Sequence, residues 1–448
     1  MLLFHIANEC IIEWLVDLPL IIGSIPVLME GGKSNMRLYI DPGTGSMLFT
    51  ILLGVLSAGI YALRNSIIRL RFFFSGGRHQ KKQEETDSFI IFSDNKRYWN
   101  VFEPICEEFE RRGVDLVYMT ASPDDPVLQK EYEHVKCEFI GEGNKAFAKL
   151  NLLSADILLS TTPGLDVYQW KRSRDVKWYV HIPHASSDLT LYRMFGLDYY
   201  DAVLCSGKYQ IEQIRKLEAL RQLPPKELII TGVTYMDAMQ LRRCSLPEKS
   251  APATTVLLAP SWGASGILSK YGNRILDALL ATGYHIIVRP HPQSYISEKT
   301  MIDTLMQHYA DDPQLEWNRD NDNFEVLSRS DLMISDFSGV FFDFSLVFDK
   351  PVIYTDTSFD DSPYDACWLE DPLWTFQTLP RIGQQLTEEN MPRIKELIDS
   401  CLQEPKYQEG RDRARRETWE NPGCAASLTV DYLLKKYDQL HNEQAPNG

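Results

Sequence analysis

Short apolar runs alternate with amphipathic stretches along most of this chain, and this alternation constrains the fold more than any other feature. In the first half, the runs typical of buried strands are residues 88–94, 114–120, 155–161, 176–184, 200–207 and 228–232. Stretches with helical periodicity lie between them, including 99–112, which is followed by Gly113, and 208–221. Strands that alternate with helices form a parallel sheet with both faces covered, so the sequence predicts an α/β fold.

The alternation is interrupted at residues 242–254, whose composition is typical of a linker. The strands expected after it are 255–261, 284–292, 331–339 and 351–356, and the helices are 269–282, 299–309 and 340–349. We therefore predict two Rossmann-like lobes, 88–241 and 255–375, followed by a C-terminal region, 376–448, with helices at 385–403 and 425–440. Ligands of open α/β sheets bind beyond the carboxyl ends of the strands, so we expect a site in a cleft between the lobes.

An uncharged apolar run near the N-terminus, residues 47–63, predicts a membrane-anchoring helix. Residues 64–82 contain six basic and no acidic side chains, and positive flanks stay in the cytoplasm, so both lobes are expected on the cytoplasmic side of the cell membrane. The anchor region is residues 1–74, with a polar linker at 75–87. A buried core helix and an anchor lying in the membrane interface are the alternatives. Residues 10–28 are also apolar but are interrupted by acidic residues and prolines, and translation could begin at Met36.

The charge and cysteine content exclude some functions. With 46 Lys and Arg against 62 Asp and Glu, the formal net charge is -16, which argues against sequence-independent binding of nucleic acid. The eight cysteines are scattered without a CxxC pair, so reduced thiols are expected and not a zinc site or a disulfide framework.

Candidate catalytic residues follow a predicted strand of the first lobe, in HIPHASSDLT (181–190). A histidine in such a loop can take a proton from a hydroxyl, because its pKa lies near the working pH. We therefore predict that His184 is a catalytic base and that Asp188 orients it. The alternative is an ordinary loop histidine. His181 is expected in the interior of the strand.

The second lobe offers cationic groups in VRPHP (288–292). Arg289 and His291, stiffened by the neighbouring prolines, could hold an oxyanion, since the arginine fork suits phosphate. A structural turn with a surface arginine is the alternative.

The segment SDFSGVFFDF (335–344) reads as a strand, a turn and the start of a helix, where backbone N–H groups favour a phosphate. Ser338 could cap the helix and bind phosphate, Gly339 lets the backbone approach closely, and Asp343 could hold a hydroxyl. An ordinary capped helix is the alternative. The predicted substrate-binding residues of this lobe are Ser261, Arg289, Ser335, Asp336, Ser338, Gly339 and Asp343.

The segment LAPSWGASG (258–266) has small and hydroxyl residues after a predicted strand, and these could line the donor site. TTPGLD (161–166) and VTYMD (233–237) show the same pattern more weakly. No DxD-like pattern stands out. We expect no obligatory protein-bound metal, although a Mg²⁺ ion could accompany a phosphorylated donor.

Taken together, the histidine loop at 181–190, APSWG at 259–263, RPHP at 289–292 and the run SDFSGVFFDFSLVFDKPVIY at 335–354 resemble one family. They are similar to the CDP-glycerol glycerophosphotransferases of teichoic-acid and capsule biosynthesis, over roughly residues 175–360. The resemblance implies a GT-B fold at the inner membrane face and transfer of glycerol phosphate from CDP-glycerol to a polyprenyl-linked acceptor.

The resemblance also assigns roles to residues. It implies that His184 is the general base, that His291 binds the donor phosphates, and that Ser338 and Asp343 belong to the donor-binding helix. The sequence departs from the family pattern at residues 185–187, which are Ala-Ser-Ser where the family usually has Gly-Thr-Pro, and at Gly339, where a second serine is common. These departures bear on the acceptor loop and on the identity of the transferred alditol phosphate.

The resulting hypothesis is that an acceptor hydroxyl, deprotonated by His184, attacks the β-phosphorus of a CDP-linked alditol, and that CMP leaves. One alternative is a GT-B glycosyltransferase that uses a nucleotide sugar. Another is a non-catalytic membrane partner in a polymer-assembly complex. The expected partners are the nucleotide donor, the lipid-linked acceptor and membrane lipid; the oligomeric state stays open.

Overall fold

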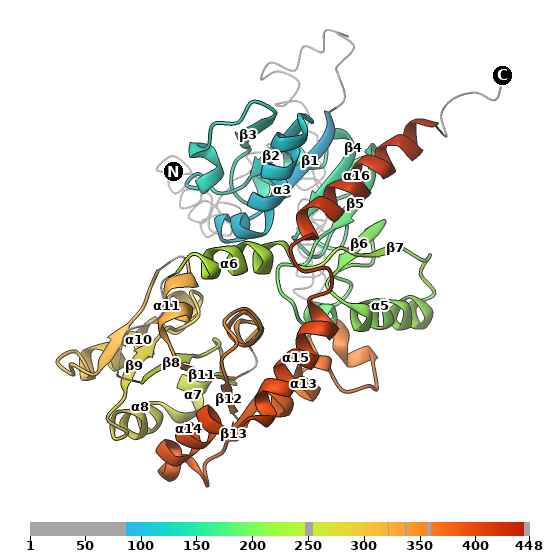
Figure 1. Cartoon of the computed structure of the whole chain (residues 1–448). Helices are drawn as coiled ribbons and strands as arrows, with labels where there is room; N and C mark the ends of the chain where they lie inside the picture. The colour runs from blue at the N-terminus through green and yellow to red at the C-terminus, as the bar shows by residue number, and fades with distance from the viewer. Residues whose placement is uncertain (1–86, 247–253, 321, 337, 356–359, 443–448) are drawn as a thin grey trace, which may run out of the picture. The chain divides into compact units, whose positions relative to one another are not determined.

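The computed structural model describes residues 87–246, 254–320, 322–336, 338–355 and 360–442 (Figure 1). The predicted membrane helix at 47–63 and nearly all of the linker at 75–87 lie outside these ranges. Within them, no helix combines the length and apolar character that crossing a bilayer requires. The described residues form one compact unit.

The first lobe is a parallel sheet of seven strands in the order β3-β2-β1-β4-β5-β6-β7. Its strands are β1 (Asp87–Ser93), β2 (Leu116–Thr120), β3 (Val135–Phe139), β4 (Ser154–Ser160), β5 (Asp175–His181), β6 (Ala202–Cys205) and β7 (Glu227–Ile230). The helices are η1 (Lys96–Tyr98), α3 (Trp99–Arg112), η2 (Pro126–Gln129), α4 (Asn144–Leu150), η3 (Leu189–Leu191), α5 (Lys208–Arg221) and α6 (Thr234–Cys244).

The second lobe is a parallel sheet of six strands in the order β10-β9-β8-β11-β12-β13. Its strands are β8 (Thr255–Ala259), β9 (His285–Val288), β10 (Leu315–Trp317), β11 (Leu332–Ser335), β12 (Val352–Thr355) and β13 (Gly383–Leu386). Its helices up to β12 are α7 (Ile267–Tyr271), α8 (Asn273–Leu280), α9 (Ser294–Ser297), α10 (Lys299–His308), α11 (Phe324–Arg329), α12 (Val340–Phe342) and the π-helical turn η4 (Asp343–Val347). The later helices are η5 (Asp365–Trp368), α13 (Trp374–Ile382), η6 (Met391–Arg393), α14 (Ile394–Gln403), α15 (Lys406–Thr418) and α16 (Ala425–Asn442).

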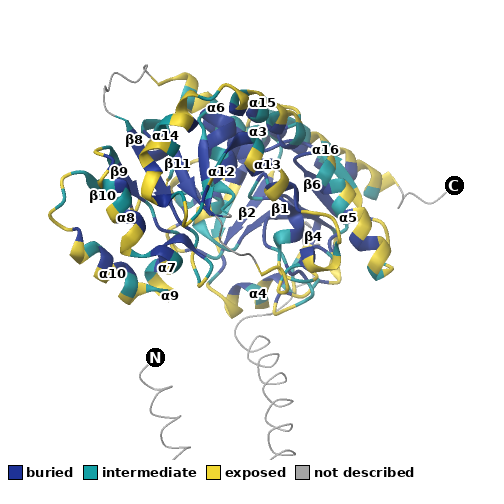
Figure 2. Ribbon diagram, turned by 90° about the horizontal axis from the view of Figure 1, so that it is seen from below, coloured by how far each residue is buried: buried dark blue, intermediate teal, exposed yellow. Residues whose placement is uncertain are grey.

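Both sheets are buried on their two faces. The central strands β1, β8 and β11 are buried along nearly their whole length, as expected of parallel strands covered by helices (Figure 2). The side chains of β1 divide between two apolar clusters, one with Ile91 and one with Phe92, on opposite faces of the sheet. This confirms the predicted α/β fold with two parallel sheets.

Several boundaries differ from the prediction. The expected helix at 269–282 is two helices separated at Gly272, whose positive φ of 53° breaks the helical path. The expected helix at 340–349 is the short α12 followed by the π-helical turn η4. The segment at 385–403 contributes β13 to the second sheet before α14 begins, so the expected lobe boundary at residue 375 falls inside the second lobe. Strands β3 and β10 and helix α15 were not predicted, because the two strands are short, at five and three residues, and α15 consists almost entirely of polar residues.

Two helices connect the lobes. Helix α6 packs against α3 of the first lobe and against η4 of the second lobe. The last helix, α16, returns to the first lobe and packs on α3 and β4 (Figure 1). The C-terminal region predicted as a separate unit therefore belongs to both lobes.

Candidate active site

The candidate residues of the first lobe follow neighbouring strands. Strands β1, β4 and β5 are adjacent in the sheet, and their carboxyl ends are followed by Asp94, Thr161 and His184. Because parallel strands present their carboxyl ends at one edge, the fold gathers these residues there. Of the three, only His184 was a leading candidate; Thr161 belongs to the weaker segment at 161–166.

His184 is partly buried and makes its polar contacts through Nδ1. This atom lies 3.0 Å from the hydroxyl of Thr161 and 3.5 Å from the hydroxyl of Tyr192. The imidazole also packs against the ring of Tyr98, with centroids 4.7 Å apart. Burial lowers the pKa of His184 to about 4, and hydrogen bonding to the Thr161 backbone partly opposes this shift. The ring is therefore neutral near pH 7, as a general base must be.

Both hydroxyls that approach the ring of His184 lie at Nδ1, and no described residue provides a hydrogen-bond partner for Nε2. When Nδ1 carries the proton of the neutral ring and donates to the Thr161 hydroxyl, the lone pair is on Nε2. In that tautomer Nε2 is the atom that can accept a proton.

Behind His184 lies a second histidine, His181, which ends β5 and is fully buried, as predicted for a strand residue. Its Nε2 is 3.2 Å from the hydroxyl of Tyr192, the same hydroxyl that approaches Nδ1 of His184. Burial holds the pKa of His181 well below its ordinary value, so it is neutral. Tyr192 therefore links two neutral imidazoles and fixes the plane of the His184 ring.

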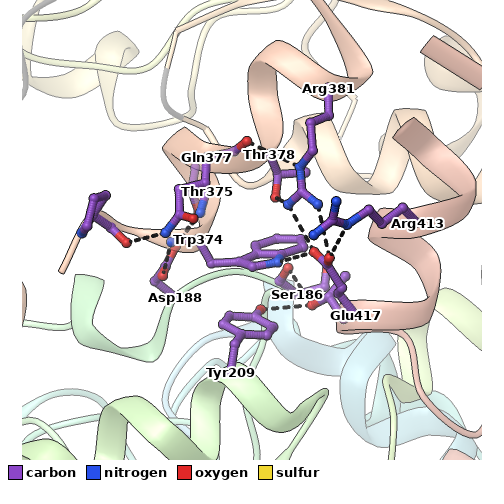
Figure 3. Close-up of polar contacts among 12 residues, drawn as sticks. Ser186, Asp188, Tyr209, Trp374, Thr375, Gln377, Thr378, Arg381, Arg413 and Glu417 are labelled. Carbon is purple, nitrogen blue, oxygen red and sulfur yellow. Dashed lines mark hydrogen bonds and ion pairs between the residues drawn. The ribbon is translucent and has the colours of Figure 1, made fainter. Parts of the chain in front are cut away.

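The predicted pairing of Asp188 with His184 is not formed. Asp188 is 3% exposed, and its carboxylate accepts hydrogen bonds from the backbone N–H groups of Trp374 and Thr375, each at 2.8 Å. It also accepts from the hydroxyl of Thr375 and from the side-chain amide of Gln213. The two backbone N–H groups are the orphan donors at the start of α13, so Asp188 is a cap that ties the His184 loop to the second lobe (Figure 3).

The same junction contains a second polar cluster, centred on Glu417 of α15 (Figure 3). Its carboxylate accepts hydrogen bonds from the guanidinium groups of Arg381 and Arg413 and from the indole N–H of Trp374. The indole stacks on Tyr209 of the first lobe, with centroids 4.6 Å apart. These contacts hold α13 and α15 against the first lobe and are structural.

In the second lobe, Arg289 and His291 follow β9, as predicted. Arg289 is partly buried, and its Nη1 donates to Oδ1 of Asn318. The side-chain NH₂ group of Asn318 in turn donates to the carboxylate of Asp320 at 2.7 Å. Asn318 therefore fixes the direction of the Arg289 guanidinium.

His291 is a hydrogen-bond donor and not a cation. Its Nδ1 accepts from the backbone N–H of Gln293 at 3.1 Å, which requires an unprotonated Nδ1 and leaves the proton on Nε2. Burial, followed by the charges of Arg97 and Arg289, lowers the pKa of His291 to about 4. The N–H of Nε2 is left to donate to an oxyanion.

Arg97 is a functional candidate that the sequence prediction missed. It lies in η1, directly after β1, where Oδ1 of Asn95 accepts from its backbone N–H at 3.1 Å. Its guanidinium lies 5.1 Å from the ring of Tyr98, the ring that packs on His184. The charge of Arg97 lowers the pKa of His184 and of His291, so it lies near both histidines. No motif marked it, because a single Arg in a polar turn has no distinctive pattern.

Three predicted substrate-binding residues have structural contacts instead. Ser335 is fully buried and donates to the carbonyl oxygen of Ala259. Asp336, also buried, accepts from the backbone N–H of Ser261 at 2.9 Å and from that of Ile267 at 3.1 Å. Ser335 and Asp336 therefore hold the loop after β8 in place, and Ser261 is fixed through its backbone.

Ser338 and Gly339 lie where the second lobe meets the His184 loop. A Cβ atom placed on Gly339 would lie 3.5 Å from the Cβ of Ala185 and 3.9 Å from Oγ of Ser187. Gly339, and not Ser338, occupies the N-cap position, with a helical φ of -59°, and Ser338 contacts the N–H of Val340 only at 3.5 Å. The predicted serine cap is therefore displaced by one residue, and the glycine permits close approach of the lobes.

Asp343 connects the lobes through Tyr235. The Tyr235 hydroxyl donates to Oδ1 of Asp343 at 3.0 Å and accepts from the backbone N–H of Ser186 at 3.2 Å. Burial raises the pKa of Asp343 to about 7. The weaker segment at 233–237 thus contributes Tyr235, which places the Asp343 carboxyl next to the loop that carries His184.

Comparison with known proteins adds an independent finding. Residues 235–367 match the sequence model of the CDP-Glycerol:Poly(glycerophosphate) glycerophosphotransferase family. The matched region contains Arg289, His291, Ser338, Gly339 and Asp343. The match confirms the resemblance found in the sequence and indicates a CDP-glycerol glycerophosphotransferase-like enzyme. None of the curated proteins compared with the chain matches it.

Solved structures with a similar fold include a variant of the wall teichoic acid polymerase TagF soaked with CDPG, with a TM-score of 0.52 and 16% identity over 87% of this chain and 98% of that one. A putative UDP-N-acetylglucosamine 2-epimerase from Listeria monocytogenes has a TM-score of 0.51 at 13% identity, covering 79% of this chain and 97% of its own. The UDP-GlcNAc 2-epimerase of Neisseria meningitidis has a TM-score of 0.50 at 14% identity, covering 78% and 100%. At these identities the likeness shows the fold alone, which is α/β with GT-B-like neighbours.

Proposed function

We propose that the protein transfers glycerol phosphate, or a related alditol phosphate, from CDP-glycerol to a hydroxyl of a membrane-linked acceptor in cell-surface polymer synthesis, with release of CMP. The observation that carries this proposal is the complementary pair of neutral histidines. His184 has a free lone pair on the first lobe, and His291 has a free N–H beside Arg289 on the second. Arg97 lies near both, and the family match covers the donor side.

The donor phosphates are bound by groups of both lobes. The diphosphate of CDP-glycerol is an anion, and the guanidinium groups of Arg97 and Arg289 are the cations close to His291. Charged donors form the strongest hydrogen bonds to phosphate oxygens, and the N–H of His291 adds a neutral one. We expect no obligatory protein-bound metal; a Mg²⁺ ion carried by the donor would add to the same positive charge.

These positions support the following reaction. The acceptor hydroxyl loses its proton to Nε2 of His184 and forms a new bond to the β-phosphorus. The bond between that phosphorus and the bridging oxygen breaks, and CMP departs with the oxygen and its electron pair. Arg289 and the N–H of His291 stabilise the charge that develops on the phosphoryl oxygens. The same proposal includes a contact between the donor phosphates and the backbone N–H groups at the helix start beside Ser338 and Gly339.

The membrane-linked acceptor and the cytoplasmic side are supported by sequence features alone. The apolar run at 47–63 and the basic flank at 64–82 would hold the lobes at the membrane surface. A polyprenyl-linked acceptor would then be presented at the height of the catalytic lobes. This part of the proposal is tested by separation of membranes from soluble protein with the full chain.

The activity is tested with a panel of CDP-alditols and nucleotide sugars, measuring free nucleotide. We expect CMP from CDP-glycerol, a loss of about 100-fold or more in kcat for His184→Ala, and no change for His308→Ala, an exposed histidine outside the site. Turnover of nucleotide sugars but not CDP-alditols would instead identify a glycosyltransferase. Donor binding without turnover would identify a non-catalytic partner.

A further inference from the structure

A large cavity lies where helix α6 of the first lobe meets η4 of the second lobe and the end of α15. Its volume is about 780 Å³. The apolar part of its wall includes Leu241, Trp419 and Pro422, and its charged lining includes Arg243 and Arg416. Leu241 is 72% exposed, so the apolar wall is accessible from solvent. No residue of the lining takes part in the proposed transfer reaction.

Two of the carboxylates in the lining, those of Asp237 and Asp349, are already satisfied. The carboxylate of Asp237 accepts from the indole N–H of Trp419 at 2.8 Å and from a backbone N–H at the start of α16 at 3.0 Å. The carboxylate of Asp349 is paired with Arg411 at 2.8 Å and with Arg415 at 2.7 Å. Because these oxygens are already used, neither carboxylate is left to neutralise a further cation of the cavity.

Two guanidinium groups of the lining have no carboxylate partner in the described part of the chain. Arg416 is exposed, and Arg243 is partly buried and donates to the carbonyl oxygen of Val347. Glu420 is the remaining acid of the lining, so two positive charges face one negative charge. Guanidinium groups match the oxygens of a phosphate, and the apolar wall beside them suits a hydrocarbon group. The cavity therefore favours an amphipathic anion.

The cavity is linked to the proposed donor site by two elements, α6 and η4, which are bonded to each other at both ends. At one end, the Tyr235 hydroxyl of α6 donates to Asp343 of η4 at 3.0 Å, beside the His184 loop. At the other end, Arg243 of α6 donates to the Val347 carbonyl of η4. These elements have only eleven and five residues, so a change at the Arg243 end would reach Asp343.

We propose that this cavity is an effector site for an amphipathic phosphate, which regulates donor binding. The anionic group of the ligand pairs with Arg243 and Arg416, and its apolar part lies against Leu241. An anion that pairs with Arg243 draws the guanidinium away from the Val347 carbonyl, so the bound ligand loosens η4 and weakens donor binding at Asp343. This regulatory step rests on the proposed function, whereas binding in the cavity does not. A soluble phosphate ester and a lipid headgroup share the required chemistry.

The first test measures binding of hexyl phosphate to the full-length protein in phosphatidylcholine nanodiscs by ligand-observed NMR. Inorganic phosphate and 1-hexanol, each of which carries one half of the probe, should bind about tenfold more weakly or less. Arg416→Ala and Leu241→Ala should each weaken hexyl phosphate by about fivefold or more. Arg393→Ala and Leu152→Ala, an exposed arginine and an exposed leucine outside the cavity, should leave binding unchanged. Phosphatidic acid added to the nanodiscs competes with the probe if the natural ligand is a lipid headgroup, and does not if it is soluble.

The second test measures the coupling by calorimetry with CDP-glycerol. Saturating hexyl phosphate should weaken CDP-glycerol binding by about fivefold or more. Arg416→Ala should leave CDP-glycerol affinity unchanged when no hexyl phosphate is present, and the hexyl phosphate concentration that gives half of the effect should rise about fivefold. Arg243→Ala should bind CDP-glycerol weakly at the outset and should no longer respond to hexyl phosphate.

The outcomes separate this proposal from the transfer reaction. If the unmodified protein does not bind CDP-glycerol, the proposed function fails, while the NMR measurement still decides whether the cavity binds its ligand. The effector site is overturned if hexyl phosphate binds no more tightly than inorganic phosphate, or if the cavity variants bind it as well as the controls do. Regulation is overturned if CDP-glycerol affinity does not respond, or if the half-effect concentration is unchanged in Arg416→Ala, as direct competition in the active site would give.

Discussion

At the scale of single residues, hydrogen bonds decide what each histidine can do. Burial lowers the pKa of both His184 and His291 to about 4, so the pKa values alone do not separate their roles. The separation comes from the contacts of Nδ1, which faces the hydroxyls of Thr161 and Tyr192 in His184 and accepts from the N–H of Gln293 in His291. His291 is thereby left with a free N–H at Nε2, and Nε2 of His184 is the atom left open for the proposed proton transfer.

The lowered pKa of His184 predicts the pH dependence of turnover. A base works only when neutral, and a folded-state pKa of about 4 keeps it neutral down to that pH. The acid limb of kcat/KM should therefore lie near pH 4 and not near the ordinary value of about 6.5. The measurement is a pH–rate profile that extends below pH 4 and up to about pH 8, with circular dichroism to verify folding at each pH. Half-loss of kcat/KM near pH 6.5 in folded protein would contradict the assigned environment.

Arg97 supplies a second prediction at this scale. Its guanidinium acts on both histidines, so Arg97→Ala should weaken CDP-glycerol binding by about tenfold or more, the usual cost of a charged hydrogen bond to phosphate. Calorimetric titration measures the affinity for CDP-glycerol. If the difference between Arg97→Ala and the unmodified protein disappears at high salt, the contribution of Arg97 is electrostatic. Arg174→Ala, an exposed arginine of the same lobe, is the control. Equal affinity of both variants would remove Arg97 from the site.

At the scale of elements, the loop after β5 is fixed at both of its ends. His184 is held by Thr161 of the first lobe, and Asp188 caps α13 of the second lobe. The position of the His184 loop thus depends on a helix that lies nearly two hundred residues further along the chain. An acidic residue four positions after a histidine suggested a catalytic pair, but the free backbone donors of a helix start compete for the same carboxylate.

This interpretation of Asp188 predicts a loss of stability. Asp188→Ala removes a buried carboxylate that accepts four hydrogen bonds, and it should lower the free energy of unfolding by about 2–4 kcal/mol. Urea denaturation measures the change, with Asp124→Ala, an exposed ion-pair residue, as the control. The acid limb of the pH–rate profile should stay in place, whereas a shift would restore Asp188 as the partner of His184.

At the scale of the whole molecule, residues 363–375 of the second lobe form a strap across the first lobe. Arg193 and Tyr364 form a β-bridge, and the carboxylate of Asp365 accepts from the backbone N–H groups of Phe195 and Gly196. Asp365 is 2% exposed and pairs with the buried Arg221. With the Asp188 cap at its end, the strap fixes the lobes that carry the two histidines.

The strap predicts a difference between two neighbouring acids. Asp365→Ala leaves Arg221 with only Asp198 and should cost about 3 kcal/mol of folding free energy. Asp371→Ala breaks an exposed pair with Lys216 and should cost about 1 kcal/mol or less. Denaturant unfolding of both variants is the measurement. Similar losses for the two would mean that the strap does not hold the lobes together.

The two sheets and the donor side could be predicted from sequence because their information is local. Apolar runs marked most strands, and the segments around Arg289, His291 and Asp343 carry distinctive motifs that match a family over residues 235–367. Arg97 and Tyr192 could not be predicted. Neither belongs to a distinctive motif, and only the folded first lobe brings them near His184.

By itself, the sequence determined the alternating α/β plan, the two lobes and the loops that bear the histidines, since hydrophobic periodicity and turn residues act over short stretches of chain. Tertiary structure alone decided the contacts of the site residues. Thr161 and Tyr192 contact His184, Asp188 caps α13, and Tyr235 donates to Asp343. The contacts of Asp188 and Tyr235 join residues more than a hundred positions apart in the chain. Their proton positions and pKa values depend on burial and hydrogen bonding, which exist only after the sheets have assembled.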